Sequence, residues 1–472
     1  MSINQENSFK PSLSLVDATM IVAGSMIGSG IFIVSAEVAR SMGSAGWMMA
    51  MWVLAGVVTL IAALSYGELS GMFPKAGGQY VYLREAYNPF IAFLFGWTQF
   101  GVIQTGTIAA VAMAFAKYLG YIVPALGEKN ILFSIGSFSV NVAQLVAIAS
   151  ILLLTYINTR GVKNGKIIQT VFTFTKLFSL FGLIVFGLII GAKAEIWNAN
   201  WQNAWSYSTV NMNGEVIANT LGSMAFLGAI AVSMKGTLFS SDAWNNVTFI
   251  AGEIKNPQKN IGRALFLGTF IVTIIYVSAN LMYLAVLPFN EIAFAEQDRV
   301  GVAAAENIFG AGAGAVTIAV MIIISTFGCN NGLILSGARI YYTMAKDGLF
   351  FRKAGELNRF DVPAYGLWVQ VIWASLLCLS GKYGDLLAMV IFGVLVFYVI
   401  TILGIFILRK TRPDVPRSYK AFGYPVLPAI YIVVALSLAV LLLIYEPRYA
   451  IPGLGIILLG IPLYFLAKKE LK

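Results

Sequence analysis

Three ionisable residues lie inside long apolar segments, where a charge requires a partner or a function. They are Lys176, Lys235 and Asp242. A charge at the centre of a membrane-spanning helix costs about 2.5–3.5 kcal/mol on insertion scales, so such residues usually face a substrate path or a proton relay. A structural partner, or a side chain that reaches the membrane interface, is the alternative for each of them. We treat all three as candidate binding or coupling residues.

The residue types that most enzymes need are scarce. The sequence contains no histidine and two cysteines, Cys329 and Cys378. Hydrolytic triads built on histidine are therefore excluded, and so is any ordinary zinc site. Both cysteines lie in apolar segments, so we expect no structural disulfide. We find no catalytic constellation and predict no enzyme activity, no metal site and no cofactor.

Two apolar segments are interrupted by residues that fit poorly in a continuous helix. Residues 28–30 read Gly-Ser-Gly, and residues 239–246 read Phe-Ser-Ser-Asp-Ala-Trp-Asn-Asn. Glycine costs about 1 kcal/mol in a helix interior relative to alanine. Unwound backbone in a bilayer is tolerated only where it is buried in protein or lines a wet cavity. For residues 28–30 alone, small-residue helix packing is the alternative explanation.

The chemistry of two such breaks matches one kind of ligand. The N-terminus of a half-helix presents free N–H groups and suits a carboxylate. Free carbonyl oxygens on the other half-helix suit an ammonium group. Together they fit the zwitterion that every α-amino acid shares.

The elements that position these residues are membrane-spanning helices. Of the 472 residues, 59% are hydrophobic and 11% are charged, with a mean hydropathy of +0.81. Soluble proteins carry about 25% charged residues, and a spanning helix needs about 20 apolar residues. The sequence predicts an all-α polytopic membrane protein in which lipid covers the surface. We predict twelve transmembrane helices, at 14–38, 45–70, 89–119, 138–158, 166–191, 217–251, 262–286, 314–344, 364–381, 384–408, 425–445 and 450–467.

The distribution of basic residues predicts the orientation of these helices. With both termini cytoplasmic, 22 of the 31 Lys and Arg residues, Arg339 among them, fall on the cytoplasmic side and seven on the opposite side. The remaining two are Lys176 and Lys235. This is the bias that the positive-inside rule describes. The formal charge of +10 therefore reflects topology, and we expect no nucleic-acid partner.

The spacing of the interrupted spans predicts an internal repeat. Spans one and six are five spans apart, and matched interruptions in two halves are typical of inverted-repeat transporters. We expect a cytoplasmic tail at 1–12 that is disordered at 1–10, a first five-helix repeat at 13–191 and a second, inverted repeat at 217–408. Residues 425–472 then hold helices eleven and twelve and a short cytoplasmic tail.

Short motifs along nearly the whole chain resemble the amino acid–polyamine–organocation superfamily, and within it prokaryotic members of the L-amino acid transporter family. The motif Gly-Ser-Gly-Ile-Phe at 28–32 is similar to the first-span signature of that family. Other matching stretches are 65–69, 74–80, 86–87, Phe239, Trp244, Asn245, Glu253, 256–257, 331–332, Arg339, 408–409 and 413–417.

The resemblance implies roles for individual residues. Amides at 28–30 take the substrate carboxylate, carbonyls at Met26, Phe239 and Asp242 take the amino group, and the Phe239 ring closes over the substrate. Lys176 stands where sodium-coupled relatives bind an ion, which argues against sodium coupling. The implied substrate-binding set is Met26, Gly28, Ser29, Gly30, Phe239, Ser240 and Asp242, and the implied coupling and gating set is Lys176, Phe239 and Lys235.

The sequence departs from the family pattern in the sixth span, where Ser240, Ser241 and Ala243 replace Ala, Tyr and Gly. One hypothesis is that Lys235, about two turns before Asp242, neutralises this acid and so favours small neutral L-amino acids as cargo. A cationic amino acid or polyamine antiporter that uses Asp242 is the alternative. Exchange and proton-linked uptake both stay open, and a channel or a non-transporting amino acid sensor is the alternative from another class.

The resemblance also bears on partners and location. Relatives that join a glycoprotein subunit use a cysteine between spans three and four, and residues 121–137 contain none. We therefore predict no disulfide-linked heavy subunit. A multi-pass protein of the plasma membrane, in a bacterium the inner membrane, is expected, with the first span retained as an anchor.

Overall fold

The computed structural model describes residues 11–136, 138–210, 216–218, 221–310, 312–380 and 383–470. The predicted disordered tail at 1–10 lies outside the described residues, and so do three of the basic residues counted for the orientation, Lys10, Lys382 and Lys472. Within the described ranges, helices account for nearly all of the regular structure. The exceptions are two short antiparallel hairpins, β1 (Ile131–Ile135) with β2 (Phe138–Asn141), and β3 (Ser208–Val210) with β4 (Val216–Ala218).

The helices follow the predicted order along the chain, with short 3-10 and π segments between them. Their bounds are α1 (Leu15–Met26), α2 (Gly30–Met42), α3 (Ala45–Met72), α4 (Gln79–Ala86), α5 (Pro89–Thr98), α6 (Gln104–Ile122), α7 (Val142–Thr159), α8 (Val162–Phe186), α9 (Ala194–Trp201), α10 (Met224–Ser240), α11 (Asn246–Phe249), α12 (Pro257–Val286), α13 (Phe289–Ala293), α14 (Val300–Phe309), α15 (Ala313–Lys346), α16 (Ala364–Ser380), α17 (Tyr383–Thr411), α18 (Val426–Tyr445) and α19 (Pro447–Glu470).

The all-α polytopic architecture is confirmed. Among the described residues, nine helices are long and apolar enough to cross a membrane, and α1 with α2 forms a tenth span that is bent by 42°. Helices α10 and α16, with 17 residues each, are shorter and lie where spans six and nine are predicted. The count of twelve spans stays a prediction.

Two predicted spans begin too early, because apolar residues at their starts form strands. Residues 138–141 belong to β2, and α7 begins only after Asn141, which forms a capping box with Gln144. Residues 216–218 form β4, and α10 starts after the N-cap Ser223, whose side chain accepts from the amide of Phe226 at 3.2 Å. Capping side chains satisfy the first free amides of a helix and so set where it begins.

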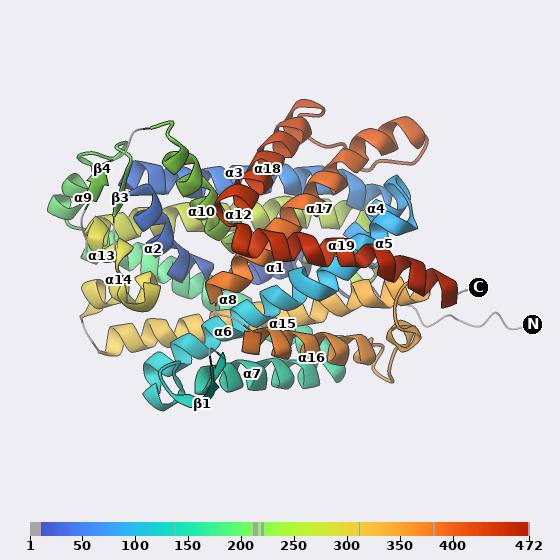
Figure 1. Ribbon diagram of the computed structural model, residues 1–472, viewed down its shortest axis with the longest axis horizontal. Helices are drawn as coiled ribbons and strands as arrows, with labels where there is room; N and C mark the ends of the chain where they lie inside the picture. The colour runs from blue at the N-terminus through green and yellow to red at the C-terminus, as the bar shows by residue number, and fades with distance from the viewer. Residues whose placement is uncertain are drawn as a thin grey trace, which may run out of the picture.

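The long helices run side by side along the longest axis of the molecule, with β3 and β4 near one end and the C-terminus at the other (Figure 1). Helices α3 and α12 pack along each other. Glycines permit this close approach: a Cβ on Gly56 would lie 2.3 Å from Thr273, and Gly67 faces Gly262. Small residues bring the backbones of membrane helices close together in this way. This contact joins the helix that follows the first interrupted span, α3, to the helix that follows the second, α12.

Candidate functional site

The first predicted break is present. Helix α1 ends at Met26, α2 begins at Gly30, and the two axes differ by 42°. Ile27 has an extended backbone, with φ −77° and ψ 90°, while its amide still donates to the carbonyl of Ala23 at 3.0 Å. The residues of this break are buried. Its backbone groups must therefore find partners inside the protein.

Lys176 supplies partners for two carbonyl oxygens of this break. Its ammonium, on α8, donates to the carbonyl of Ile27 at 2.8 Å and also to that of Gly24. The side chain is only 2% exposed. A buried ammonium is tolerated only where acceptors replace water. The lysine thus links the unwound part of the first span to the fifth.

A tyrosine connects the two interrupted spans. The Tyr276 hydroxyl, on α12, lies 3.0 Å from the carbonyl oxygen of Met26 and 3.1 Å from that of Ser240. Cys329 on α15 adds a contact from its sulfur to the carbonyl oxygen of Ser25 at 3.0 Å. The ends of α1 and α10 therefore meet at one hydroxyl group.

The second predicted break is also present, between the end of α10 at Ser240 and the start of α11 at Asn246. The amide of Ser241 closes α10 by donating to the carbonyls of Thr237 and Leu238, each at 3.1 Å. Ala243 follows with φ +66°. This left-handed conformation costs a residue with a side chain roughly 1–2 kcal/mol. The strain falls where the family pattern has glycine.

The two breaks touch through a glycine. A Cβ on Gly30 would lie 2.1 Å from the Ser240 hydroxyl and 2.9 Å from its Cα, and one on Gly28 would lie 3.2 Å from the sulfur of Cys329. Residues 28–30 therefore combine unwinding with the small-residue packing considered as its alternative. The start of α2 rests directly on the end of α10, and both are buried.

The side chain of Asp242, in the second break, contacts α17. Its carboxylate accepts a hydrogen bond from the Tyr398 hydroxyl at 2.6 Å. Asp242 and Tyr398 line two narrow cavities, of about 10 and 20 Å³. The first of these cavities is also lined by polar residues, namely Gln79, Gln99, Gln104, Thr107, Asn245 and Asn246. A polar compartment therefore adjoins the second break.

The hypothesis that Lys235 neutralises Asp242 is wrong. The Lys235 ammonium lies 3.0 Å from a carboxylate oxygen of Glu37 and 3.6 Å from one of Glu446. Residues seven apart share a face only in a continuous helix, and α10 ends at Ser240. Side chains on a helix also lean toward its N-terminus, so Lys235 reaches away from the break.

Comparison with known proteins identifies the family. A family model described as amino acid permease matches residues 13–465. The chain belongs to the amino acid permease family. It is 31% identical over 471 residues to a serine/threonine exchanger of Bacillus subtilis, with 99% of both chains covered. It is 28% identical over 467 residues to the mouse b(0,+)-type amino acid transporter 1, covering 97% of this chain and 88% of that one.

A further relative is the human large neutral amino acids transporter small subunit 2, 29% identical over 460 residues, with 97% of this chain and 81% of that one covered. Both the family and these relatives are transporters. With its many apolar helices, this permease is a multi-pass membrane protein that transports amino acids.

The permease also contains a buried ion pair that its sequence did not predict. Arg339, counted on the cytoplasmic side although it falls within the predicted span 314–344, lies inside α15 and is fully buried. Its guanidinium donates to the Glu253 carboxylate at 2.9 Å. Both residues belong to matched motifs, but nothing in their spacing indicated that they meet. A charge deep in an apolar helix is the signal that could have identified Arg339.

Backbone contacts beside this pair join the two interrupted spans. The carbonyl of Glu253 accepts from the amides of Ser12 and Leu13 at 2.8 and 2.9 Å, and the amide of Lys255 donates to Leu13 at 2.8 Å. The chain entering α1 is thereby joined to the chain leaving α11. At the other end, Arg40 on α2 pairs with Asp298 at 2.6 Å. The permease therefore holds both halves of its interrupted spans by contacts outside the break itself.

Proposed function

We propose that this permease exchanges small neutral L-amino acids across the membrane by alternating access, independently of sodium. The observation that carries the proposal is the ammonium of Lys176 on the carbonyls of Gly24 and Ile27. Carbonyl oxygens of unwound backbone are the ligands that transporters of this architecture offer to a coupling ion. A fixed ammonium that already occupies two of them supports transport without sodium.

The two breaks provide complementary groups for the zwitterion. The amides of Gly28, Ser29 and Gly30 lie at and just before the start of α2. They would take the substrate carboxylate, as helix N-termini favour anions. The carbonyls of Met26, Phe239 and Asp242 would take the ammonium group. Ser240 lies at the contact between the two half-helices. Phe239, buried beside it in the last turn of α10, would cover the substrate as a gate, since α10 packs against α2.

The names of the relatives support neutral cargo, since they include a serine/threonine exchanger and a large neutral amino acids transporter. One observation favours the cationic alternative. Within the described part of the chain, Asp242 forms no ion pair. Lys235 pairs with Glu37 and Glu446 instead. A substrate ammonium on a side chain could therefore meet the Asp242 carboxylate.

Uptake into proteoliposomes separates these functions. We expect labelled serine or threonine to enter only vesicles preloaded with a neutral amino acid, with no effect of replacing sodium by choline. Uptake into empty vesicles that follows an imposed pH gradient would instead show proton coupling. Uptake that neither saturates nor responds to preloading would indicate a channel, and binding without any uptake would indicate a sensor.

The variant Asp242→Asn separates neutral from cationic cargo. If neutral amino acids are the substrates, their exchange persists in this variant, because no charge on their side chains needs the carboxylate. Arginine, lysine and polyamines should compete poorly with labelled serine in the parent protein. Strong competition by them in the parent, lost selectively in the variant, would favour the cationic or polyamine antiporter.

The same proposal extends to membrane placement and assembly. We propose a plasma membrane location with both termini cytoplasmic, two inverted repeats at 13–191 and 217–408, and no disulfide-linked heavy subunit. The charge bias supports the orientation. Cys329 and Cys378 are free and buried, and residues 121–137 offer no cysteine. Exchange by the purified single chain, with maleimide labelling of cysteines placed in alternate loops, tests both points.

A further inference from the structure

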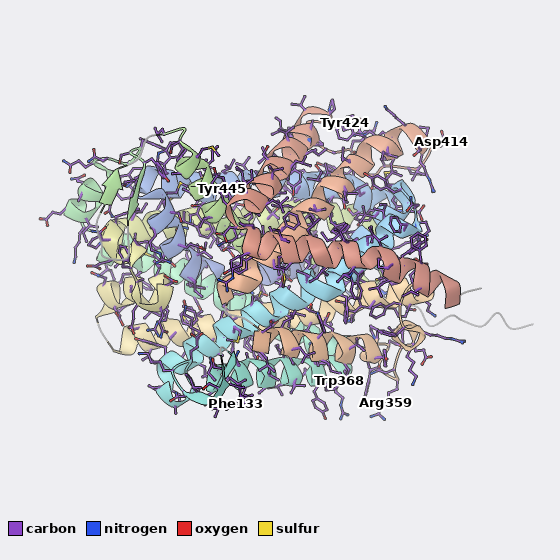
Figure 2. The ribbon with its side chains drawn as sticks, in the orientation of Figure 1. Phe133, Arg359, Trp368, Asp414, Tyr424 and Tyr445 are labelled. Carbon is purple, nitrogen blue, oxygen red and sulfur yellow. The ribbon has the colours of Figure 1, made fainter. Side chains whose placement is uncertain are left out.

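The segment at 409–426 joins α17 to α18 and is rich in positive charge. It contains five basic residues, Arg409, Lys410, Arg412, Arg417 and Lys420, against one acidic residue, Asp414. Figure 2 shows Asp414 and Tyr424 at the outer edge of the molecule, where this segment turns between the two helices. The segment therefore stands at the end of two spans, where the membrane surface lies.

A buried carboxylate holds the 409–426 segment in one shape. Glu68, on α3 and fully buried, accepts from Arg409 at 3.0 and 2.7 Å, from Arg417 at 3.2 Å and from the amide of Ala421 at 2.7 Å. The guanidinium of Arg409 also lies 3.6 Å from the centre of the Tyr424 ring. One carboxylate between two guanidiniums leaves an excess positive charge. The segment is thus both positive and preorganised.

The exposed side of the segment carries basic residues that are not neutralised. Lys410 and Lys420 are exposed and, within the part of the chain that the structure describes, form no ion pair. The side chain of Arg412 is 47% exposed, and its guanidinium lies 3.0 Å from a carboxylate oxygen of Glu85. Basic residues directly at the end of a spanning helix are attracted to anionic lipid headgroups.

Apolar side chains lie beside these charges. Phe422 is 67% exposed and Val426 is 61% exposed. On α18, Val426 shares one helical face with Ile430 and Val433, which are 45% and 64% exposed, because residues four and seven apart lie on the same side of a helix. The lipid-facing surface of α18 therefore continues into Phe422. This continuity favours a membrane lipid over a soluble anion as the partner.

We propose that the 409–426 segment is a binding site for anionic phospholipids. The headgroup phosphate lies against Lys410, Lys420 and the excess charge around Glu68, and Phe422 enters the boundary of the acyl chains. Mixed basic and aromatic residues are the usual composition of such interfacial sites. The site is distinct from the transport site, because none of its residues lies in either break.

The test uses the full-length protein, delipidated in detergent and titrated with an equimolar mixture of phosphatidylglycerol and phosphatidylcholine. Native mass spectrometry gives the ratio of the two bound lipids. A basic residue near an anionic surface changes binding about fivefold. The double variant Lys410→Gln/Lys420→Gln should therefore lower the preference for phosphatidylglycerol roughly 30-fold, while melting as the parent does.

Matched variants make the outcome specific. Lys129→Gln/Lys193→Gln removes the same net charge from exposed lysines outside this segment and should leave the preference unchanged. An equal loss in that control, or an undiminished preference in Lys410→Gln/Lys420→Gln, would overturn the proposal. Phe422→Ser should weaken the binding of phosphatidylglycerol. Displacement of this lipid by millimolar inorganic phosphate alone would show a soluble-anion site and would also overturn the proposal.

Discussion

The ion cluster around Lys235 leads to a quantitative prediction. Lys235 is 6% exposed and contacts Glu37 at 3.0 Å, while Glu37 is 35% exposed. Exposed ion pairs contribute about 0.2–1 kcal/mol, and breaking a fully buried pair costs about 3–5 kcal/mol. A pair with one buried and one partly exposed partner should lie between these limits. We expect a coupling free energy of about 1–2 kcal/mol between Lys235 and Glu37.

A double-mutant cycle measures this coupling. The parent, Lys235→Met, Glu37→Gln and the double variant are unfolded by sodium dodecyl sulfate in mixed micelles, and the coupling is the deviation from additivity. Glu446, at 3.6 Å, should show a weaker coupling, below about 1 kcal/mol. Methionine is unbranched like lysine and lacks only the terminal ammonium position, so changes in packing stay small.

A second cycle tests the direction in which Lys235 points. Lys235→Met and Asp242→Asn should be additive within about 0.3–0.5 kcal/mol, as expected for residues that do not interact. A substantial coupling between Lys235 and Asp242, together with none between Lys235 and Glu37, would refute this account of the site.

Three further substitutions test the breaks. Ala243→Gly should raise the unfolding free energy by about 0.5–1 kcal/mol, since it relieves a left-handed backbone; a decrease in the same micelle unfolding assay would contradict this. Gly30→Ala should cost about 1–3 kcal/mol through overpacking against Ser240 and slow serine exchange in proteoliposomes, and unchanged exchange would argue against the close contact. Lys176→Met removes two charge-assisted hydrogen bonds, each worth about 1.5–3 kcal/mol. Exchange should fall more than tenfold in this variant, measured with and without sodium, whereas uptake at the parental rate would exclude a coupling role for Lys176.

The sequence predicted the helices and both breaks because their signals are local. Apolar runs of spanning length identify membrane helices directly. Residues 28–30 and 239–246 stand out because glycine and clustered polar side chains are unfavourable inside such helices. The same local signal led to error at 138–141 and 216–218, where apolar residues form strands. An apolar run indicates burial or contact with lipid. It does not by itself distinguish a strand from the start of a helix.

The partners of the site residues could not be predicted, since they depend on contacts between distant parts of the chain. Tyr276 and Tyr398 are ordinary aromatic residues in apolar helices, and only the fold brings them to Ser240 and Asp242. The expected link from Lys235 to Asp242 assumed a helix that continues past residue 240. The break that was correctly predicted is the reason why that pairing fails.

In the proposed function, contacts at the first break would connect substrate occupancy with conformation. The Tyr276 hydroxyl carries one proton and lies within hydrogen-bond distance of the carbonyls of Met26 and Ser240. In the proposed function, the Met26 carbonyl also accepts the substrate ammonium. The Met26 carbonyl also accepts from the Gly28 amide at 2.9 Å. A bound ammonium would compete with Gly28 and Tyr276 for this oxygen and would so favour donation by the tyrosine to Ser240. Substrate binding would then shift a hydrogen bond from α1 to α10, and a ligand can shift an equilibrium between conformations only through such differential contacts. In the proposed function, the link between α1 and α10 would therefore be a contact through which an amino acid favours one conformation over the other.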